Sequence, residues 1–295
     1  MMKFKQGIFS FVSLIILSVV ALTAAADSSV WKVSSGDNLV YVGGTLHVLR
    51  QGDYPLPSEF DRAYKGADKL VFETDLEKLH TPEVMQRMQQ AVRYPEGISG
   101  LDKRVSAALY QRIVTVWTQY GLPVEALNGL RPSGIVITLT MLNLKLAGVD
   151  AQGIDDFYHG RAFADGKPAG GLESVDQQIG LLAGMGAGDE ETFMRTSLDE
   201  LEASGGIVND MVDAWRRGSL ADLERLVIDD MRRESPEAFR TLIVDRNQKW
   251  LPQIDLMLQD RPVEFVLVGS GHLAGKEGLI AQLQQRGYRV EQVRN

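Results

Sequence analysis

Short apolar segments with β-strand propensity lie at both ends of this chain, and they restrict its fold more than any other feature of the sequence. The N-terminal segments are Val30–Val33, Asn38–Gly43 and Lys69–Glu73, and the C-terminal segments are Val263–Val268 and Tyr288–Val293. The residues Ser34-Ser35-Gly36-Asp37 favour a turn, which predicts a hairpin between the first two segments. A helical segment at Lys276–Arg286 lies between the last two segments, which together with it form a predicted βαβ unit. Both ends are therefore expected to contribute to one sheet.

The segment between these ends, from about residue 81 to residue 250, is mostly helical in pattern. Thr81-Pro82-Glu83 and Ser235-Pro236-Glu237 each offer a capping residue, a proline and an acid at a helix start. The expected helices are 105–120, 132–146, 176–182, 190–203, 207–215, 220–231 and 237–259, with a short extended piece at 167–172. We predict a mixed α/β (α+β) fold in one domain over residues 27–295: a central mixed β-sheet from the N- and C-terminal parts, covered by a large helical insertion.

The first 26 residues have the organisation of a cleavable export signal. Lys3 and Lys5 precede an apolar or small run, Ile8–Leu22, which ends in Thr23-Ala24-Ala25-Ala26. The run is about 15 residues long, shorter than the roughly 20 that cross a bilayer, so a cleaved signal is favoured over a membrane anchor. We expect the protein to be periplasmic or secreted, with no stable membrane anchor after signal removal.

Charge and composition exclude several classes of function. The chain has 39 acidic and 31 basic residues and a net charge of −8, which disfavours nucleic acid as a partner because phosphate binding needs a concentrated basic surface. It has no cysteine, which excludes disulfides, zinc–thiolate sites and cysteine nucleophiles. A metal ion would have to be held by carboxylates and by the four histidines.

Two of the histidines occur in matching contexts. Gly44-Thr45-Leu46-His47 and Gly269-Ser270-Gly271-His272 each follow a predicted strand. A glycine at a strand end permits a sharp turn, so both imidazoles can be directed across the carboxyl edge of the sheet. Glu73 closes the third apolar strand, and Asp75 follows it. His47, Glu73 and His272 together would leave an open position for water, as catalytic metal sites do. Either histidine taken alone is more often a loop or capping residue with a satisfied hydrogen bond.

Further short motifs accompany these two. The full set is Val42-Gly43-Gly44-Thr45-Leu46-His47, Phe72-Glu73-Thr74-Asp75, Gly153-Ile154-Asp155, Gly166-Lys167, Leu172-Glu173, Gln177-Gln178, Arg246-Asn247, Trp250 and Val268-Gly269-Ser270-Gly271-His272-Leu273. Together they resemble the TraB/GumN family, whose relatives include the Tiki proteins and, more remotely, the erythromycin-esterase and ChaN-like groups. Tiki proteins are regarded as metal-dependent proteases. The resemblance implies that His47, Glu73 and His272 are the catalytic residues and the ligands of a divalent cation (Mn, Co or Zn), in a mixed sheet with helices.

Arg246 lies on the long predicted helix 237–259 and matches the Arg-Asn pair of the family. By that match it binds a substrate carboxylate or stabilises an oxyanion. The alternative is a salt bridge to an acidic residue, including Glu73, which would lower the pKa of Glu73. Gly44, Gly269 and Ser270 are assigned to substrate binding together with Arg246.

The remaining two histidines lie outside these motifs. Asp155, Asp156 and His159 are spaced to share one helix face, which permits a metal site but favours a local ion pair or hydrogen bond. His80 directly precedes a helix start and is expected in a loop.

The sequence leaves three functions open. We favour an exported, divalent-metal-dependent peptidase that acts through a metal-activated water at His47, Glu73 and His272. The alternatives are a non-catalytic periplasmic protein that binds a peptide, haem or another small ligand, and a metal-independent esterase with Glu73 or His272 as general base. In each case the partner is a peptide or small molecule, and no motif identifies the substrate or the oligomeric state.

Overall fold

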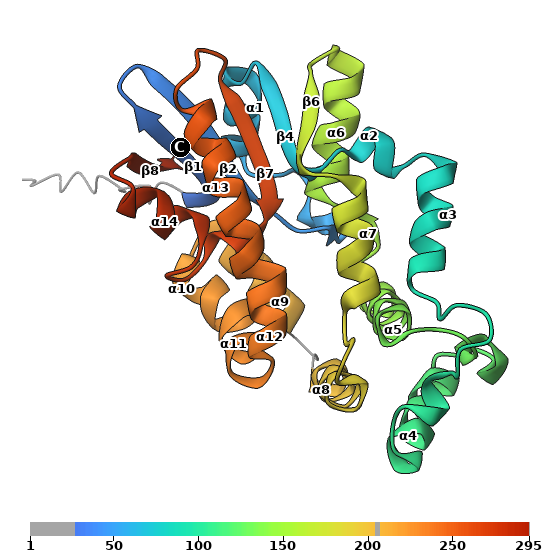
Figure 1. Ribbon diagram of the computed structural model, residues 1–295. Helices are drawn as coiled ribbons and strands as arrows, with labels where there is room; N and C mark the ends of the chain where they lie inside the picture. The colour runs from blue at the N-terminus through green and yellow to red at the C-terminus, as the bar shows by residue number, and fades with distance from the viewer. Residues whose placement is uncertain (1–26, 204–206, 295) are drawn as a thin grey trace, which may run out of the picture.

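The computed structural model describes residues 27–203 and 207–294 and contains a sheet with helices on both faces (Figure 1). The predicted export signal, residues 1–26, lies outside the described residues. Within the described ranges, no helix is long and apolar enough to cross a membrane.

The central sheet contains β1 (Asp27–Ser35), β2 (Asn38–Thr45), β4 (Lys69–Thr74), β6 (Ala169–Glu173), β7 (Glu264–Gly269) and β8 (Arg289–Arg294), in the order β6-β4-β7-β2-β1-β8. β2, β7, β4 and β6 pair in parallel, whereas β1 is antiparallel to β2 and β8. Gly36, with a φ of 58°, makes the tight turn of the predicted hairpin. The two ends of the chain meet in this sheet as expected, and the helical middle adds β6 at one edge, where the sequence predicted only a short extended piece.

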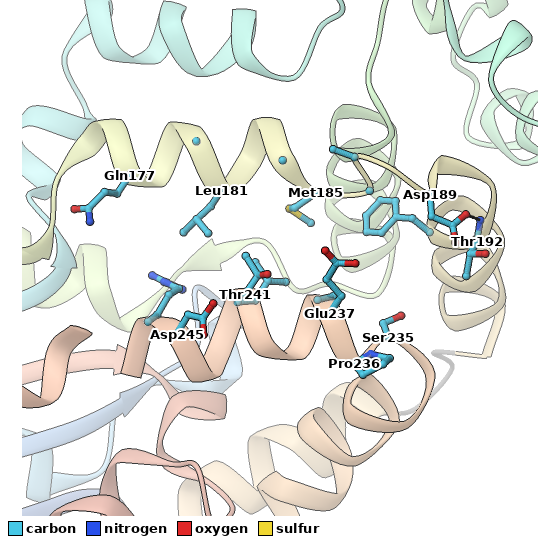
Figure 2. Close-up of a pocket in the computed structure, with 18 of the residues that line it drawn as sticks. Gln177, Leu181, Met185, Asp189, Thr192, Ser235, Pro236, Glu237, Thr241 and Asp245 are labelled. Atoms are coloured by element: carbon cyan, nitrogen blue, oxygen red, sulfur yellow. Dashed lines mark hydrogen bonds between the residues drawn. The ribbon is translucent and has the colours of Figure 1, made fainter. Parts of the chain in front are cut away.

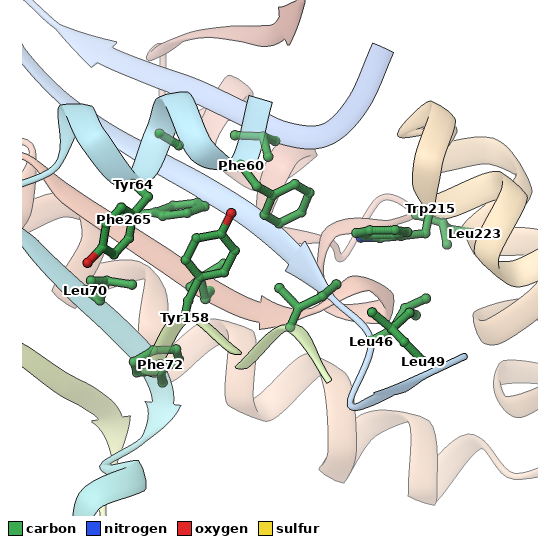
Figure 3. Packing of buried hydrophobic residues seen from close by; sticks show 14 of the residues in the cluster. Leu46, Leu49, Phe60, Tyr64, Leu70, Phe72, Tyr158, Trp215, Leu223 and Phe265 are labelled. Atoms are coloured by element: carbon green, nitrogen blue, oxygen red, sulfur yellow. The ribbon is translucent and has the colours of Figure 1, made fainter. Parts of the chain in front are cut away.

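Helices cover both faces because the inner strands are apolar on both sides. Alternate residues of β7 point into different layers: Phe265 and Leu267 belong to one hydrophobic cluster, and Val266 and Val268 to another. The first cluster (Figure 3) is covered by α1 (Ser58–Gly66), α6 (Ile154–Asp165) and α9 (Ile207–Arg217), and the second by α13 (Asp245–Met257) and α14 (Leu279–Gln285).

The rest of the helical middle forms a lobe beside the sheet (Figure 1). Its helices are α3 (Pro82–Ala91), α4 (Ala107–Gln119), α5 (Pro132–Leu146), α7 (Val175–Gly184) and α8 (Glu190–Ala203). The last four lie close to their predicted ranges, and α3 begins at the predicted start signal Thr81-Pro82-Glu83. α4, α5 and α8 enclose a hydrophobic cluster of their own, which includes Ile113, Trp117, Leu139 and Met194. The lobe therefore has a core separate from those of the sheet.

Short elements connect these parts. They are β3 (Val48–Leu49), which pairs with β5 (Ala151–Gln152); the helices α2 (Leu76–Leu79), α10 (Leu220–Leu223), α11 (Asp229–Glu234) and α12 (Pro236–Phe239); the 3-10 turns Gln51–Asp53, Leu101–Lys103, Val124–Leu127 and Ser270–Leu273; and the π turns Glu224–Ile228 and Arg240–Val244. α12, the second π turn and α13 follow one another directly. The long helix predicted at 237–259 is thus present with a wider turn inside it, which residue periodicity does not reveal.

Candidate functional site

Four side chains meet at the carboxyl edge of the parallel strands. His47 lies two residues beyond β2, Glu73 is the penultimate residue of β4, Glu173 ends β6, and His272 lies in the 3-10 turn after β7. Since β2, β7, β4 and β6 run in the same direction, all four residues lie at one edge of the sheet, where sites in α/β folds are usually found.

Gly269, the last residue of β7, lies between three of these side chains. A Cβ atom at this position would be 3.2 Å from Glu73 Oε1, 3.7 Å from His272 Cδ2 and 3.9 Å from His47 Nε2. The Gly269 N–H donates to Glu73 Oε1 at 2.7 Å. The structure therefore brings His47, Glu73 and His272 together, and a glycine leaves them the room to approach one point.

His272 is buried and held as a neutral imidazole. The side-chain nitrogen of Asn247 donates to the carbonyl oxygens of His272 and Glu277, both at 3.0 Å, which turns Asn247 Oδ1 toward His272 Nδ1 at 2.8 Å. Nδ1 therefore carries the proton, and Nε2 accepts from Arg246 Nη1 at 3.1 Å. Burial, opposed in part by Glu73, lowers the pKa of His272 to about 4.

Arg246 links the buried groups of the site. Nε donates to Glu173 Oε1 at 2.9 Å, and Nη2 donates to Glu173 Oε2 at 3.0 Å and to Glu73 Oε2 at 2.6 Å. The Trp250 ring centroid lies 4.6 Å from the guanidinium carbon and 4.4 Å from the centroid of the His272 ring. Of the five N–H groups of Arg246, four have acceptors among the described residues, which leaves one N–H of Nη1 available.

Glu73 is ionised at neutral pH. Burial would raise its pKa, but His272, Arg246, His47 and the Gly269 N–H together lower it to about 2. Because His272 is neutral at pH 7, Arg246 is the neighbouring charge in direct contact that keeps Glu73 ionised. This salt bridge is one of the two roles predicted for Arg246, and it makes Glu73 a good acceptor but a weak base.

His47 is in a different environment, with its side chain 70% exposed. Its Nδ1 is hydrogen-bonded to Asp155 Oδ2 at 3.0 Å, and this contact raises the pKa of His47. Nε2 is then free to face the site. Asp155 lies in the first turn of α6, which begins directly against the His47 loop: a Cβ on Gly153 would lie 2.1 Å from the His47 carbonyl oxygen. Only glycine permits this contact.

The other residues predicted for the site lie around this centre. Gly44 is buried at the end of β2, and its carbonyl accepts the indole N–H of Trp215 at 2.7 Å. Ser270 is 4% exposed and packs beside Gly44. Asp75 does not join the histidines, because β4 ends one residue earlier and the Asp75 side chain caps α2 by accepting from the Lys78 N–H at 3.1 Å.

The acids and histidine predicted to share a helix face divide between two places. Asp155 contacts His47, as described above. Asp156 Oδ1 lies 3.4 Å from His80 Nε2, and the His80 and His159 ring centroids are 5.9 Å apart. The ion-pair interpretation of this segment therefore describes it better than a metal site.

Glu173, Asn247 and Trp250 belong to the site and to the motifs quoted above, but none of them had a predicted role. Trp250 contacts the Arg246 and His272 side chains and donates its indole N–H to Glu173 Oε1 at 2.9 Å. Glu173 ends a parallel strand, the same signal that identified Glu73, but its strand is short and rich in glycine. Asn247 orients His272 through contacts with two backbone carbonyl groups, which the sequence does not reveal.

A metal ion bound by all of His47, Glu73 and His272 does not fit this arrangement. The Nε2 lone pair of His272 faces Arg246, and Glu173 holds that guanidinium in place, so a positive charge occupies the approach to His272. In the part of the chain that the structure describes, no group of three or more His, Asp or Glu side chains is arranged to hold a metal ion. His47 Nε2 and Glu73 Oε1 remain as donors of suitable type.

Comparisons with known proteins identify relatives of this chain. A model of the TraB/PrgY/gumN family matches residues 29–292. A protein named metalloprotease TIKI homolog, from Nematostella vectensis, is 23% identical over 317 residues, which cover 86% of this chain and 64% of the relative. The chain thus spans slightly less than two thirds of that relative's length. No solved structure matches the chain.

Proposed function

The chain belongs to the TraB/PrgY/gumN family, and from this premise we propose that it is an exported hydrolase of peptide or related acyl bonds. The observation that carries the proposal is the meeting of His47 and Glu73 beside Gly269, with Arg246 hydrogen-bonded to the same Glu73 carboxylate. The name of the TIKI relative supports a peptide as the substrate. Export is supported by the sequence pattern of residues 1–26 alone.

The side chains present supply the parts that acyl hydrolysis needs. The free N–H of Arg246 donates to the substrate carbonyl oxygen and stabilises the negative charge that develops there. Glu73 Oε1 holds a water molecule and accepts its proton as the water oxygen bonds to the carbonyl carbon. His47, protonated beside Asp155, gives its proton to the leaving nitrogen or oxygen as the bond to carbon breaks. Proton transfer from Glu73 to His47 then restores both groups.

The low basicity of Glu73 limits this route. A carboxylate with a pKa of about 2 is a weak general base, so we expect slow turnover by the side chains alone. A divalent cation lowers the pKa of a water that it binds, and the resemblance implies Mn, Co or Zn. His47 and Glu73 have suitable donor atoms, but His272 would require Arg246 to withdraw. Dependence on a cation is therefore a separate part of the proposal with its own test.

A peptide-cleavage screen on the purified protein tests both parts. The metal content is measured by elemental analysis, and a peptide library is then incubated with chelated protein, with and without Mn²⁺, Co²⁺ or Zn²⁺, while mass spectrometry identifies products. His47→Ala should lower kcat/KM by at least about 100-fold. His80→Ala, which changes a histidine outside the site, is the matched control and should leave it unchanged.

The outcomes separate the alternatives. Cleavage only with an added cation supports the metal-dependent peptidase. Cleavage that survives chelation supports hydrolysis by the side chains alone, as in the esterase interpretation. A retained ligand without any product, in every condition, would replace the hydrolase by a binding protein.

A further inference from the structure

A groove leads away from this site along the boundary between the lobe and the sheet (Figure 2). Its volume is about 550 Å³, and it lies between α7 on one side and α12, the π turn and α13 on the other. Glu173 and Arg246 line it, so the groove begins at the candidate site. Ligand pockets usually have volumes of roughly 300 to 1,000 Å³, and this groove falls within that range.

Apolar side chains form much of the inner surface of the groove. Leu181 points from α7 across the groove toward the π turn, and Met185, just beyond the end of α7, points toward α12 (Figure 2). Phe193 from α8 and Leu242 from the π turn also line it. All four are only partly buried, so apolar area stays accessible beside a polar site. Such a surface gains free energy when it takes up an apolar side chain.

The charged residues that line the groove are mostly acidic. Five of the seven are acids and two are bases: Glu173, Asp189, Glu234, Glu237 and Asp245, with Arg246 and Lys249. Arg246 is neutralised by its contacts with Glu173 and Glu73 at the site. Glu234 and Asp245 are paired with Arg233 and Arg240. Among the remaining charges that line the groove, Asp189 and Glu237 outnumber Lys249, which favours a cationic ligand group.

Glu237 is the acid best placed to meet such a group. It rises from α12 toward Met185 across the groove (Figure 2). Asp189 is occupied as the cap of α8, and Glu234 pairs with Arg233, whereas Glu237 forms no ion pair within the described ranges. Its carboxylate therefore lies beside an apolar surface without a counter-charge.

The distance between Glu237 and Arg246 along the helical elements indicates how many peptide residues separate the two contacts. Glu237 precedes Arg246 by nine residues on consecutive helical elements, which corresponds to about 14 Å at roughly 1.5 Å per residue. An extended peptide advances about 3.3 Å per residue. About four residues therefore reach from a bond held at Arg246 to the carboxylate of Glu237.

We propose that this groove binds the substrate as an extended peptide, with an apolar side chain among Leu181, Met185 and Leu242 and a lysine or arginine beside Glu237. The basic residue lies about four residues from the cleaved bond. The inference rests on the proposed function for the place of cleavage, but binding in the groove does not require turnover. A fatty-acid carboxylate fits less well, because it would meet like charges.

Fluorescence anisotropy on the full chain tests the groove with fluorescein-labelled decapeptides. The first peptide carries a leucine and, two residues later, a lysine in an alanine and serine background. The second replaces the lysine by glutamate, and the third replaces the leucine by serine. We expect the first to bind at least about tenfold more tightly than the others, a difference of about 1.4 kcal/mol. Glu237→Lys should reverse the order of the first two.

Two further variants serve as a control and as an alternative to Glu237→Lys. Glu291→Lys makes the same charge change on β8, at the opposite edge of the sheet from β6, and should keep the original order. Glu237→Gln, the milder change, should abolish the preference for lysine if Glu237→Lys does not fold. Equal binding of the three peptides, or an order that neither Glu237 variant changes, overturns the inference. So does tight binding of a fluorescent palmitate that Glu237→Lys does not affect.

Cleavage of the unlabelled peptides separates this inference from the proposed function. Binding in the expected order without any cleavage refutes the hydrolase and leaves the groove assignment intact. Cleavage that is indifferent to the lysine and to Glu237 supports the hydrolase and refutes the groove assignment.

Discussion

The turn that carries His47 and the turn that carries His272 follow neighbouring parallel strands. Their imidazoles nevertheless differ in protonation, because the structure favours the charged form of His47 and the neutral form of His272. His47 is 70% exposed and its contact with Asp155 raises its pKa. The His272 side chain is 6% exposed, contacts Arg246, and has its pKa lowered to about 4. The difference comes from the helix packed against each turn, α6 for His47 and α13 for His272. A histidine's charge is therefore set by its tertiary neighbours and not by its own motif.

Removal of Arg246 should have the largest effect on stability, because Arg246 contacts His272 and two buried carboxylates. Arg246→Met leaves Glu73 and Glu173 in a buried setting without their counter-charge, which should lower the free energy of unfolding by about 3–5 kcal/mol. Urea denaturation measures the change. Lys249→Met, on the same helix but exposed, is the matched control and should change stability by less than about 0.5 kcal/mol. A loss of similar size in both variants would contradict the importance of the buried network.

Stability should depend on pH in opposite directions at the two turns. His272 has a folded pKa of about 4 against 6.5, so the unfolded chain binds more protons below pH 6.5. The folded state then loses about 3 kcal/mol as the pH falls from 6.5 to 4. Glu73, with a pKa of about 2 against 4.5, continues this loss at lower pH. The contribution of His47 is fully present below pH 6.5 and is lost as the pH rises through its raised folded pKa.

Urea unfolding at a series of pH values measures both slopes. His272→Gln should flatten the loss of stability between pH 6.5 and 4, and His47→Gln should flatten the loss on the alkaline side. Parallel profiles for the parent and both variants would show that the two histidines do not differ in the way described.

The common features of the two turns were predictable from the sequence, and their difference was not. β2, β4 and β7 are recognisable as apolar runs, so parallel pairing is enough to bring His47, Glu73 and His272 to one edge. Their catalytic roles stay predictions. The partners Asp155 and Arg246 come from helices outside the two turns, 108 residues from His47 and 26 residues from His272. Which residue faces which turn depends on how each helix is rotated and packed. Local periodicity carries no information on that contact.

The same limit applies to the edge of the sheet and to the lobe. β6 begins Ala169-Gly170-Gly171, which has little β propensity, so the strand that delivers Glu173 was predicted only as a short extended piece. The lobe helices α4, α5, α7 and α8 were predicted close to their observed ranges because each has helical patterning and a recognisable start, which is a capping side chain in three of them and a proline at the first turn of α5. The groove between α7 and α12 depends on the placement of the lobe, which helix prediction does not provide.

Loss of the Asn247 side chain should have an intermediate effect on the His272 turn. Asn247→Leu leaves the His272 Nδ1–H and two carbonyl groups without their partner, at a cost of about 1–3 kcal/mol. The tautomer also loses its constraint, which ¹⁵N chemical shifts of the imidazole nitrogens would detect. Gln248→Leu, at the next and exposed position of the helix, should change neither quantity. Unchanged shifts in Asn247→Leu would mean that Arg246 alone fixes the ring.

Asp155→Asn should have the smallest effect on stability and the most specific effect on charge. The pair is largely solvent-exposed on the histidine side, so the free energy of unfolding should change by less than about 1 kcal/mol. The pKa of His47 should fall toward its ordinary value, as an NMR titration of its ring protons would show. If His47 acts as the general acid, kcat/KM of the variant should decline at a lower pH than that of the parent. An equal shift in the pKa of His272 would show that the two histidines titrate as one coupled pair. Their different pKa values would then be a property of the pair, and could not be assigned to the separate neighbours of each histidine.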